Sequence, residues 1–333
     1  MKLQKHKKTN FPLFKFIIFS IALLLIISTG LVIGEGSYEV ETGAYPIKIT
    51  DDLGNTLTLN SKPQKIASGT LLTDEILLSL VEKERLIAVT KLSEDPEISN
   101  ISGEVADIPN KITLNVEVIV SLSPDIIFLA SWSDSAKVKQ LRDAGLNVYQ
   151  IKSPVTINEI ESTIKKIAHV VGEEKNGTKI VSWMEDKLNS VERVVSAVPQ
   201  TKKLTVMDYG TWGASFGSGS SWNSIVEHAG LKNAVASLKS DQWGNVPVSK
   251  EKLIELDPDI LILPSWVWGD PTGADKFFKK IVTDPSLQSM KAIKNNRVYR
   301  IPEKYKSATS QYIVYAVEEL AKLAYPDKFK KTN

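Results

Sequence analysis

The chain has 333 residues, and its 41 Lys and Arg residues against 39 Asp and Glu residues give a formal net charge of +2. All five Lys among residues 1–34 precede the first acid, Glu35, so the remainder has more acidic than basic groups. This balance excludes a nucleic-acid-binding surface that rests on overall basicity. Cysteine is absent, which excludes disulfides, thiolate metal sites, cysteine nucleophiles and a lipid-modified N-terminal cysteine.

Residues 16–34 form an uncharged stretch of 19 residues rich in Ile, Leu, Val and Phe, preceded by a Lys-rich start. As a helix it spans roughly 28 Å, close to the ~30 Å of membrane hydrocarbon. Two interpretations stay open for residues 1–34: an N-terminal membrane anchor, or a signal peptide that is cleaved before Glu35. In both, the body is exported to the outer face of the cytoplasmic membrane, anchored or secreted. Residues 35–44 are predicted to be a linker.

Residues 45–173 are predicted to form a first α/β lobe. A hairpin with strands at 47–50 and 56–59 opens it. Short apolar runs then alternate with helical patterns, which predicts a mainly parallel sheet flanked by helices. The predicted strands cover 65–68, 86–90, 125–130 and 147–151, and the predicted helices cover 73–81, 116–122, 135–144 and 157–171.

A long amphipathic pattern follows, with apolar residues at steps of three or four from Ile180 to Val198, and it ends before Pro199. It predicts one connecting helix within 174–199. The alternation then resumes and predicts a second α/β lobe over 200–333. The predicted strands lie near 204–209, 260–264 and 298–301, and the predicted helices near 223–229, 250–256, 274–282 and 311–323.

An internal repeat relates the two lobes. EVIVSLSPDIIFLASW (Glu117 to Trp132) aligns without gaps on EKLIELDPDILILPSW (Glu251 to Trp266), and eight of the 16 positions are identical. Each copy predicts a helix that a proline ends, followed by a buried strand. An offset of 134 residues is far longer than a solenoid period, so the repeat indicates a duplicated lobe.

Common catalytic and phosphate-binding motifs are absent. The sequence contains no GxxxxGK[ST], HExxH or GxSxG pattern, so the chain is not itself an ATPase. Beyond the first residues it has only His169 and His228, and both are interpreted as structural. We therefore expect no catalytic residues, no metal site built by the protein and no intrinsic cofactor.

Tryptophans are placed mainly in predicted loops or at element ends. Trp132 and Trp266 are repeat equivalents directly beyond matching strands, and Trp212 follows the strand that ends at Tyr209. Ligands of open α/β sheets bind outside the carboxyl ends of the strands, and aromatic rings there suit a large, flat or partly apolar ligand. No arginine lies beside these residues, which disfavours strongly anionic ligands. The predicted ligand-binding residues are Trp132, Tyr209, Trp212, Trp243, Trp266 and Trp268.

Two acidic residues occupy corresponding helices of the two lobes. Glu75 lies near the start of the first helix of the first lobe, and Glu227 on the first helix of the second. They are interpreted either as surface carboxylates that serve solubility and the helix dipole, or as a symmetric pair of exposed carboxylates that bind a cationic partner.

Several stretches together resemble the helical-hinge substrate-binding proteins of ATP-driven importers, the cobalamin and ferric-siderophore binding group. They run in order over most of the exported body: ITDDLGNTLTL, KIAS, TDEILLSLVEKERLIAVT, VEVIVSLSPDIIFLAS, LRDAGLNVY, SIVEHAGLKNAVA, LIELDPDILIL and KNNRVYRIP. The resemblance implies two lobes joined by one long α-helix, and it places the family's permease-contacting glutamates at Glu75 and Glu227. Residues 68–72 read SGTLL and depart from the Ser-Pro-Ser-like loop of the family.

The predicted function is therefore the solute-binding component of an ATP-driven importer. It captures a metal chelate or corrinoid-like ligand, such as a ferric siderophore, cobalamin or haem, between its lobes. Its predicted partners are an ABC permease with its ATPase subunits, the small-molecule ligand, and the membrane, which residues 16–34 would enter. Two alternatives stay open: an exported carboxylate-based hydrolase with Asp208, Asp241 and Asp270 as candidate acids, and an anchored sensor or adhesion module on the same fold.

Overall fold

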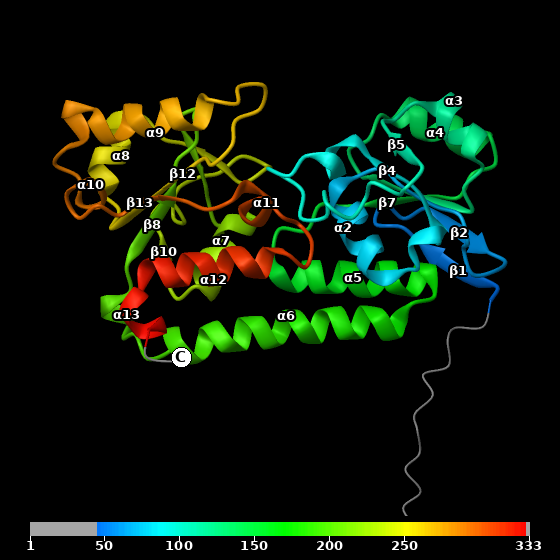
Figure 1. Cartoon of the computed structure of the whole chain (residues 1–333), viewed down its shortest axis with the longest axis horizontal. Coiled ribbons are helices and arrows are strands. Elements are labelled where there is room, and N and C mark those ends of the chain that lie inside the picture. Colours follow the sequence, from blue (N-terminus) through cyan, green and yellow to red (C-terminus); the bar gives the residue numbers. More distant parts are fainter. Residues whose placement is uncertain (1–44, 331–333) are drawn as a thin grey trace, which may run out of the picture. The chain divides into compact units, whose positions relative to one another are not determined.

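The computed structural model describes residues 45–330. The predicted membrane segment 16–34 and the predicted linker 35–44 lie outside the described residues. Within residues 45–330, no helix has the length and apolar character needed to cross a membrane. Residues 45–330 lie in one compact unit, which contains two α/β lobes side by side, as predicted (Figure 1).

The first lobe is built on a five-stranded, entirely parallel sheet in the order β5-β4-β3-β6-β7. A separate antiparallel hairpin of β1 and β2 precedes it, as predicted. Its strands are β1 (Ile47–Thr50), β2 (Thr56–Leu59), β3 (Ile66–Ser68), β4 (Leu86–Thr90), β5 (Asn110–Ile112), β6 (Ile126–Ala130) and β7 (Val148–Ile151). Its helices are α2 (Leu71–Leu80), α3 (Val116–Leu122), α4 (Ser135–Asp143) and α5 (Ile157–Val171).

The second lobe has a four-stranded parallel sheet in the order β10-β8-β12-β13 and an antiparallel ribbon of β9 and β11. The strands are β8 (Thr205–Asp208), β9 (Ala214–Phe216), β10 (Lys232–Asn233), β11 (Asn245–Pro247), β12 (Ile260–Leu263) and β13 (Val298–Arg300). The helices are α7 (Ser221–His228), α8 (Lys250–Leu256), α9 (Gly273–Thr283), α10 (Lys291–Lys294), α11 (Glu303–Lys306), α12 (Ile313–Ala324) and α13 (Pro326–Phe329).

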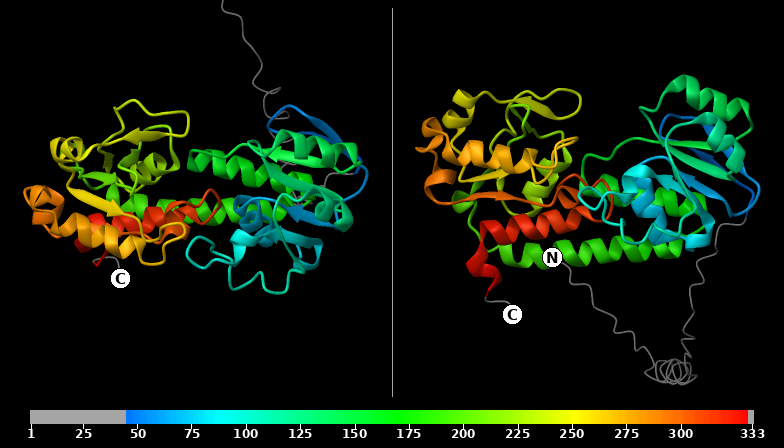
Figure 2. Two further views of the ribbon diagram at one scale, coloured as in Figure 1. Left: turned by 90° about the horizontal axis from the view of Figure 1, so that it is seen from above. Right: turned by 45° about the horizontal axis from the view of Figure 1, so that its top comes forward.

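Helix α6 (Glu174–Val195) joins the lobes and runs beneath both of them (Figure 1 and the right view of Figure 2). It packs against α5 and α12. Gly177 permits the close approach to α5, because a Cβ at this position would lie 2.5 Å from Ala168 Cβ. The helix ends at Val195, four residues before the expected boundary at 199, and the lobe boundaries themselves stay predictions.

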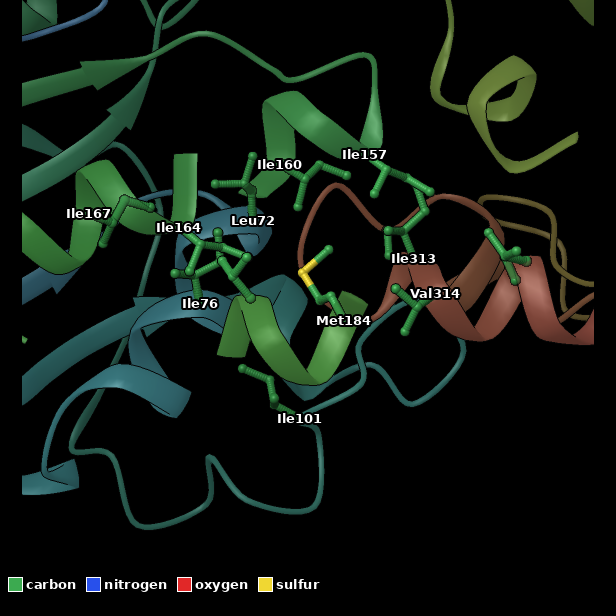
Figure 3. Close-up of a cluster of buried hydrophobic side chains, with 14 of the residues drawn as sticks. Leu72, Ile76, Ile101, Ile157, Ile160, Ile164, Ile167, Met184, Ile313 and Val314 are labelled. Atoms are coloured by element: carbon green, nitrogen blue, oxygen red, sulfur yellow. The ribbon is translucent and has the colours of Figure 1, made fainter. Parts of the chain in front are cut away.

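One apolar core continues from the first lobe into the second through these helices. Met184 of α6 is fully buried and lies among Ile160 of α5, Leu72 of α2 and Ile313 of α12 (Figure 3). Helix α5 begins at a capping box, in which Thr156 and Glu159 bond each other's backbone N–H groups. The shared core ties the helices of both lobes together and so positions the sheet edges that face each other.

The internal repeat is also a structural repeat. Helices α3 and α8 are both followed by a C-cap residue with positive φ, Ser123 (φ 48°) and Asp257 (φ 40°). The aspartate after each proline then binds the start of the neighbouring strand of its sheet, β3 in the first lobe and β8 in the second. Asp125 Oδ2 accepts from Gln64 N at 2.7 Å, and Asp259 Oδ2 accepts from Thr205 N at 2.8 Å.

Several elements differ from the sequence-based expectation. The short strands β5 and β10, the ribbon β9–β11 and the one-turn helices α10, α11 and α13 were not predicted. Strands of two or three residues carry too little apolar periodicity to be recognised alone. Helix α7 begins two residues before the expected 223–229 and so includes Trp222, which is buried in the core.

Candidate functional site

The carboxyl ends of the first-lobe strands form an edge that faces the second lobe. Because all five strands are parallel, the loops after β3, β4, β5, β6 and β7 emerge at this one edge. Three cavities lie along it, and each includes at least one residue of the second lobe. This is the place where the strand-end rule predicts a ligand.

The first cavity, which we call the Leu129 cavity, measures about 360 Å³ and is mainly apolar. The second lobe contributes Trp268 to its lining. The lining residues are Gly69, Thr90, Lys91, Leu92, Ile112, Thr113, Leu114, Ile119, Leu129, Ser133 and Trp268. An apolar cavity beneath an indole ring suits the hydrocarbon part of a ligand.

The second, the Trp132 cavity, measures about 240 Å³. It shares Gly69 and Leu92 with the Leu129 cavity, so the two adjoin. Its residues are Gly69, Thr70, Leu71, Leu72, Leu92, Ala130, Trp132, Ile151, Ser153 and Thr309. Four residues of the SGTLL segment, Gly69 to Leu72, therefore line this cavity.

The third, the Trp266 cavity, measures about 640 Å³ and lies between the lobes. Asp95 and Glu97 line it from the first lobe, in the loop after the 3-10 turn Lys91–Glu94. The loop after β12 lines it from the second lobe with Ser265, Trp266, Val267, Trp268, Gly269, Asp270 and Pro271. Because Trp268 lines both this and the Leu129 cavity, the two are neighbours.

Trp266 and Trp268 form an edge-to-face pair, with ring centroids 5.5 Å apart and planes at 82°. Trp268 is nevertheless 72% exposed, and Trp132, beside its own cavity, is 66% exposed. Large exposed rings in a concave site are a marker of ligand contact, because their apolar area stays unburied until something covers it. The structure thus brings Trp132, Trp266 and Trp268 to one cleft.

The other predicted contacts line none of these three cavities. Tyr209 is buried in the second-lobe core and packs against Phe277, with ring centroids 6.1 Å apart. Trp212 is 94% exposed in the loop before β9, and Trp243 is exposed in a turn before β11. For all three the predicted ligand contact stays a prediction.

Gly69 brings the loop after β3 into direct contact with β6. Its N–H donates to Phe128 O at 2.9 Å. A Cβ at this position would lie 2.5 Å from Leu129 Cδ2 and 3.0 Å from Phe128 O. The glycine therefore lets the loop after β3 contact β6 directly, at the position between the Leu129 and Trp132 cavities.

Beneath this edge, Thr70 caps the N-terminus of α2, and its hydroxyl accepts from Thr73 N at 3.1 Å. The next residue, Asp74, is fully buried and accepts from Thr90 N at 3.2 Å and from Thr90 Oγ1 at 2.5 Å. Burial raises the pKa of Asp74 to about 7, against the opposing effect of hydrogen bonds from Ser68 and Thr90. Asp74 therefore links α2 to the end of β4, where Thr90 lines the Leu129 cavity.

The prediction that Glu75 is a surface carboxylate is wrong. Its exposed fraction is 2%, and its carboxylate accepts from Asn100 N at 2.8 Å, Asn100 Nδ2 at 2.9 Å and Ser310 Oγ of the second lobe. Burial raises the pKa of Glu75 despite these bonds. The sequence placed Glu75 in the first turns of a helix but gave no sign that the second lobe covers this face.

Further bonds extend this contact into what we call the interlobe seam, made by Glu75, Ser79 and Asn100 with Lys304, Ser310 and Gln311. Gln311 Nε2 donates to Glu75 O at 2.9 Å and to Ser79 Oγ at 3.0 Å. Asn100 Nδ2 also donates to Lys304 O at 2.7 Å. The lobes are therefore held by polar contacts in addition to α6.

Glu227 is exposed, as predicted, near the end of α7. It accepts from Asn223 Nδ2 at 2.9 Å. It lines a cavity of about 410 Å³ together with Leu188 and Glu192 of α6, apart from the three cavities of the cleft. The two acids thus do not form a symmetric exposed pair.

The carboxylates considered for hydrolysis do not assemble into one pair. Asp208 is buried at the end of β8 and pairs with Lys306 Nζ at 2.9 Å. Asp241 and Asp270 each accept from the backbone of their own exposed loops, Asp241 from Trp243 N at 2.8 Å and Asp270 from Thr272 N at 3.0 Å. Of the three, only Asp270 lines a cavity of the cleft. Among residues 45–330, no three His, Asp or Glu side chains cluster in a way that would hold a metal ion.

Sequence reasoning missed the aliphatic first-lobe residues that line the Leu129 cavity, such as Leu92, Leu114 and Leu129. For Leu92 and Leu129 a usable signal was present, because they lie near the ends of predicted strands, as Trp132 does, whereas Leu114 follows a strand that was not predicted. The predicted ligand contacts were tryptophans and one tyrosine, so these aliphatic residues were not among them.

A model of the periplasmic binding protein family matches residues 66–305. YvrC of Bacillus subtilis (strain 168), an uncharacterized ABC transporter substrate-binding lipoprotein, is 27% identical over 301 residues, 87% of this chain and 89% of the relative. The cobalamin-binding protein of Halobacterium salinarum is 22% identical over 222 residues, 66% of this chain and 58% of that relative.

Solved structures share the fold. MolA of Haemophilus influenzae, solved with bound molybdate, aligns with a TM-score of 0.69 at 20% identity, over 86% of this chain and 94% of MolA. The heme binding protein HmuT aligns with a TM-score of 0.66 at 20% identity, over 85% of this chain and 91% of HmuT. At such identities the likeness concerns the arrangement of lobes and sheets.

Proposed function

The chain belongs to the periplasmic binding protein family, and from that premise we propose that it captures a metal chelate or corrinoid-like solute between its lobes for an ATP-driven importer. The proposed ligand class comprises ferric siderophores, cobalamin and haem. A cobalamin-binding relative and a haem-binding structural neighbour support this class. The protein would act at the outer face of the cytoplasmic membrane.

The observation that carries this proposal is the row of three adjoining cavities at the first-lobe sheet edge, to which the second lobe contributes Trp268 in two cavities and Trp266 in one of them. Their volumes of about 640, 360 and 240 Å³ suit a ligand of several hundred daltons. The lining combines indole rings and aliphatic side chains with a few polar groups. This composition fits a bulky, partly apolar chelate better than a small ion.

The lobes support a largely preformed cleft. The helix α6, the continuous core and the interlobe seam all restrict their relative movement. A preformed cleft loses little free energy to ordering when it binds. We therefore expect only small lobe movements on ligand binding.

Tryptophan fluorescence and thermal shift test ligand capture. The full chain is titrated with cobalamin, haemin and ferric hydroxamate or catecholate complexes, and a true ligand raises Tm by mass action. Trp268→Ala should weaken binding at least tenfold, because Trp268 lines two of the cavities. Trp183→Phe is the matched control, since Trp183 packs on Tyr315 outside the cleft. No response to any member of the panel would refute the proposed ligand class.

A permease and its ATPase are the proposed partners, with Glu227 as the exposed carboxylate that contacts a cationic permease surface. Glu227→Lys should lower ligand uptake by cells that carry the importer and leave ligand affinity in solution unchanged. Unchanged uptake would remove Glu227 from the proposal and favour the sensor or adhesion alternative.

A further inference from the structure

We propose that the Trp266 cavity selects solutes that carry positive charge at the end facing the second lobe, and discriminates against anionic solutes of the same shape. This inference rests on the proposed function, in which the solute binds in the cleft. It specifies the charge of the solute, which membership of the family does not decide, since a structural neighbour, MolA, binds the anion molybdate.

Carboxylates from both lobes converge on this cavity. Asp95 and Glu97 line it from the first lobe and Asp270 from the second. Among the described residues, the Glu97 side chain has no hydrogen-bond or ion-pair partner, and Asp95 uses only Oδ1, which accepts from Glu97 N at 3.0 Å. Hydrogen bonds from Thr272 hold the pKa of Asp270 below its usual range, so it is ionised at neutral pH.

Nearby cations neutralise this charge only in part. Lys276 Nζ lies 3.3 Å from Asp270 Oδ2, in an exposed pair that salt screens. No lysine or arginine lines the Trp266 cavity itself. Lys91 lines the neighbouring Leu129 cavity and is the one basic residue among the linings of the three cavities.

Arginine, the usual side chain for binding anions, is engaged elsewhere in the described chain. Arg85 binds Glu173 and Pro63 O, Arg142 binds Asp51, and Arg300 binds Asp275. Arg297 donates to Ala324 O, and Arg193 lies on α6. None of them lines the cleft, so an anionic head group would meet carboxylates without a matching guanidinium.

The Trp266–Trp268 pair is the second feature of this cavity that favours a cationic solute. Indole faces attract cations, and desolvation in a concave site strengthens this attraction. The edge-to-face packing leaves Trp268 largely exposed beside Trp266. Carboxylates and indoles that line the same cavity are the chemistry that recognises an ammonium group or a cationic metal complex.

The test uses two series of ligands in which the body is constant and the charge changes. The first is the ferric complex of a linear trihydroxamate with a terminal ammonium, compared with its N-acetyl and N-succinyl derivatives, which are neutral and anionic. The second compares diaquacobinamide with dicyanocobinamide. We expect about fivefold tighter binding per unit of positive charge at low ionic strength, and a smaller difference at high salt.

The variant with Asp95→Asn, Glu97→Gln and Asp270→Asn should lose this preference while the neutral members still bind. Asparagine keeps the oxygen that caps each turn, and the backbone bond from Lys304 N to Glu97 O is unaffected. Glu185→Gln on α6, which lines none of the three cavities, is the control for a general change in charge.

The outcomes separate the two proposals. Cation preference that the triple variant abolishes supports the charge proposal. Equal or tighter binding of the anionic members overturns it and leaves ligand capture standing. Absence of binding by every member of both series, together with no response to the wider panel, overturns the proposed function and the charge proposal with it.

Discussion

Glu75 and Ser310 lie 235 positions apart in the chain, and the Ser310 hydroxyl donates a hydrogen bond to the Glu75 carboxylate across the two lobes. Both side chains are buried. The bond belongs to the interlobe seam, whose members come from α2 and the loop at Asn100 on one side and from α11 and the segment between α11 and α12 on the other. A residue that the family resemblance assigns to permease docking here holds the lobes together.

Glu75→Ala should therefore lower stability strongly. It leaves the partly buried Asn100 N–H and the buried Ser310 hydroxyl without their acceptor and opens a small cavity, which costs about 2–4 kcal/mol. Urea unfolding followed by circular dichroism measures the loss. Glu227→Ala, at an exposed position, is the control and should change stability by less than about 0.5 kcal/mol. Equal stability of the two variants would contradict the burial of Glu75.

Asp74 should make stability depend on pH. Its pKa is about 7 in the folded chain, against 3.8 for an unperturbed aspartate, so between about pH 4 and pH 7 the folded state holds a proton that the unfolded state has lost. Stability therefore falls as pH rises through this interval, by up to about 1.4 kcal/mol per pH unit, and this contribution is flat above it.

Asp74→Asn should flatten that dependence, because its side chain does not ionise. Urea midpoints at several pH values between 4 and 8 measure the slope. Asp107→Asn is the matched control, since Asp107 is 85% exposed and pairs only weakly with Lys83, 3.6 Å away. A slope in Asp74→Asn equal to that of the natural chain would show that Asp74 titrates near its ordinary value.

The buried pair of Asp208 and Lys306 should behave as one unit. Burial raises the pKa of Asp208, whereas the pKa of Lys306 is raised because attraction to Asp208 and Glu303 outweighs its burial. We take the pair as charged at neutral pH because the two groups are 2.9 Å apart. Lys306→Met alone should cost about 3–5 kcal/mol, since it leaves a buried carboxylate unpaired.

Adding Asp208→Asn to Lys306→Met should recover part of that loss, because no unpaired charge then remains. Unfolding of both single variants and the double variant completes the cycle. Strict additivity of the single losses would show that the two side chains do not interact.

Gly69→Ala should destabilise the loop between the Leu129 and Trp132 cavities. The new Cβ would meet Leu129 Cδ2 and the Phe128 carbonyl, which costs about 1–3 kcal/mol. Gly103→Ala is the control, since a Cβ there meets nothing within 4 Å, and it should be neutral or raise stability slightly. A crystal structure or melting curve of Gly69→Ala that matches the natural chain would contradict this packing.

The sequence by itself determined the elements and the class of the fold. Prolines and apolar runs located helix Val116–Leu122, strand Leu86–Thr90 and helix Lys250–Leu256 at their observed bounds. The repeat predicted that Asp125 and Asp259 would be equivalent, and the structure confirms the duplicated unit around them. These features depend on local periodicity and on backbone restrictions that a few neighbouring residues decide. The family match confirms the resemblance to importer binding proteins.

Only the tertiary structure decided which loops meet. Trp132 and Trp266 reach one cleft and Tyr209 enters a core, although the sequence placed all three at or directly beyond strand ends. Glu75 is covered because the segment that carries Ser310 folds back over α2 from the far end of the chain. The order of the strands and the packing of α12 against α6 decide which of these residues meet. Such long-range contacts leave no local pattern in the sequence around the residues that they join.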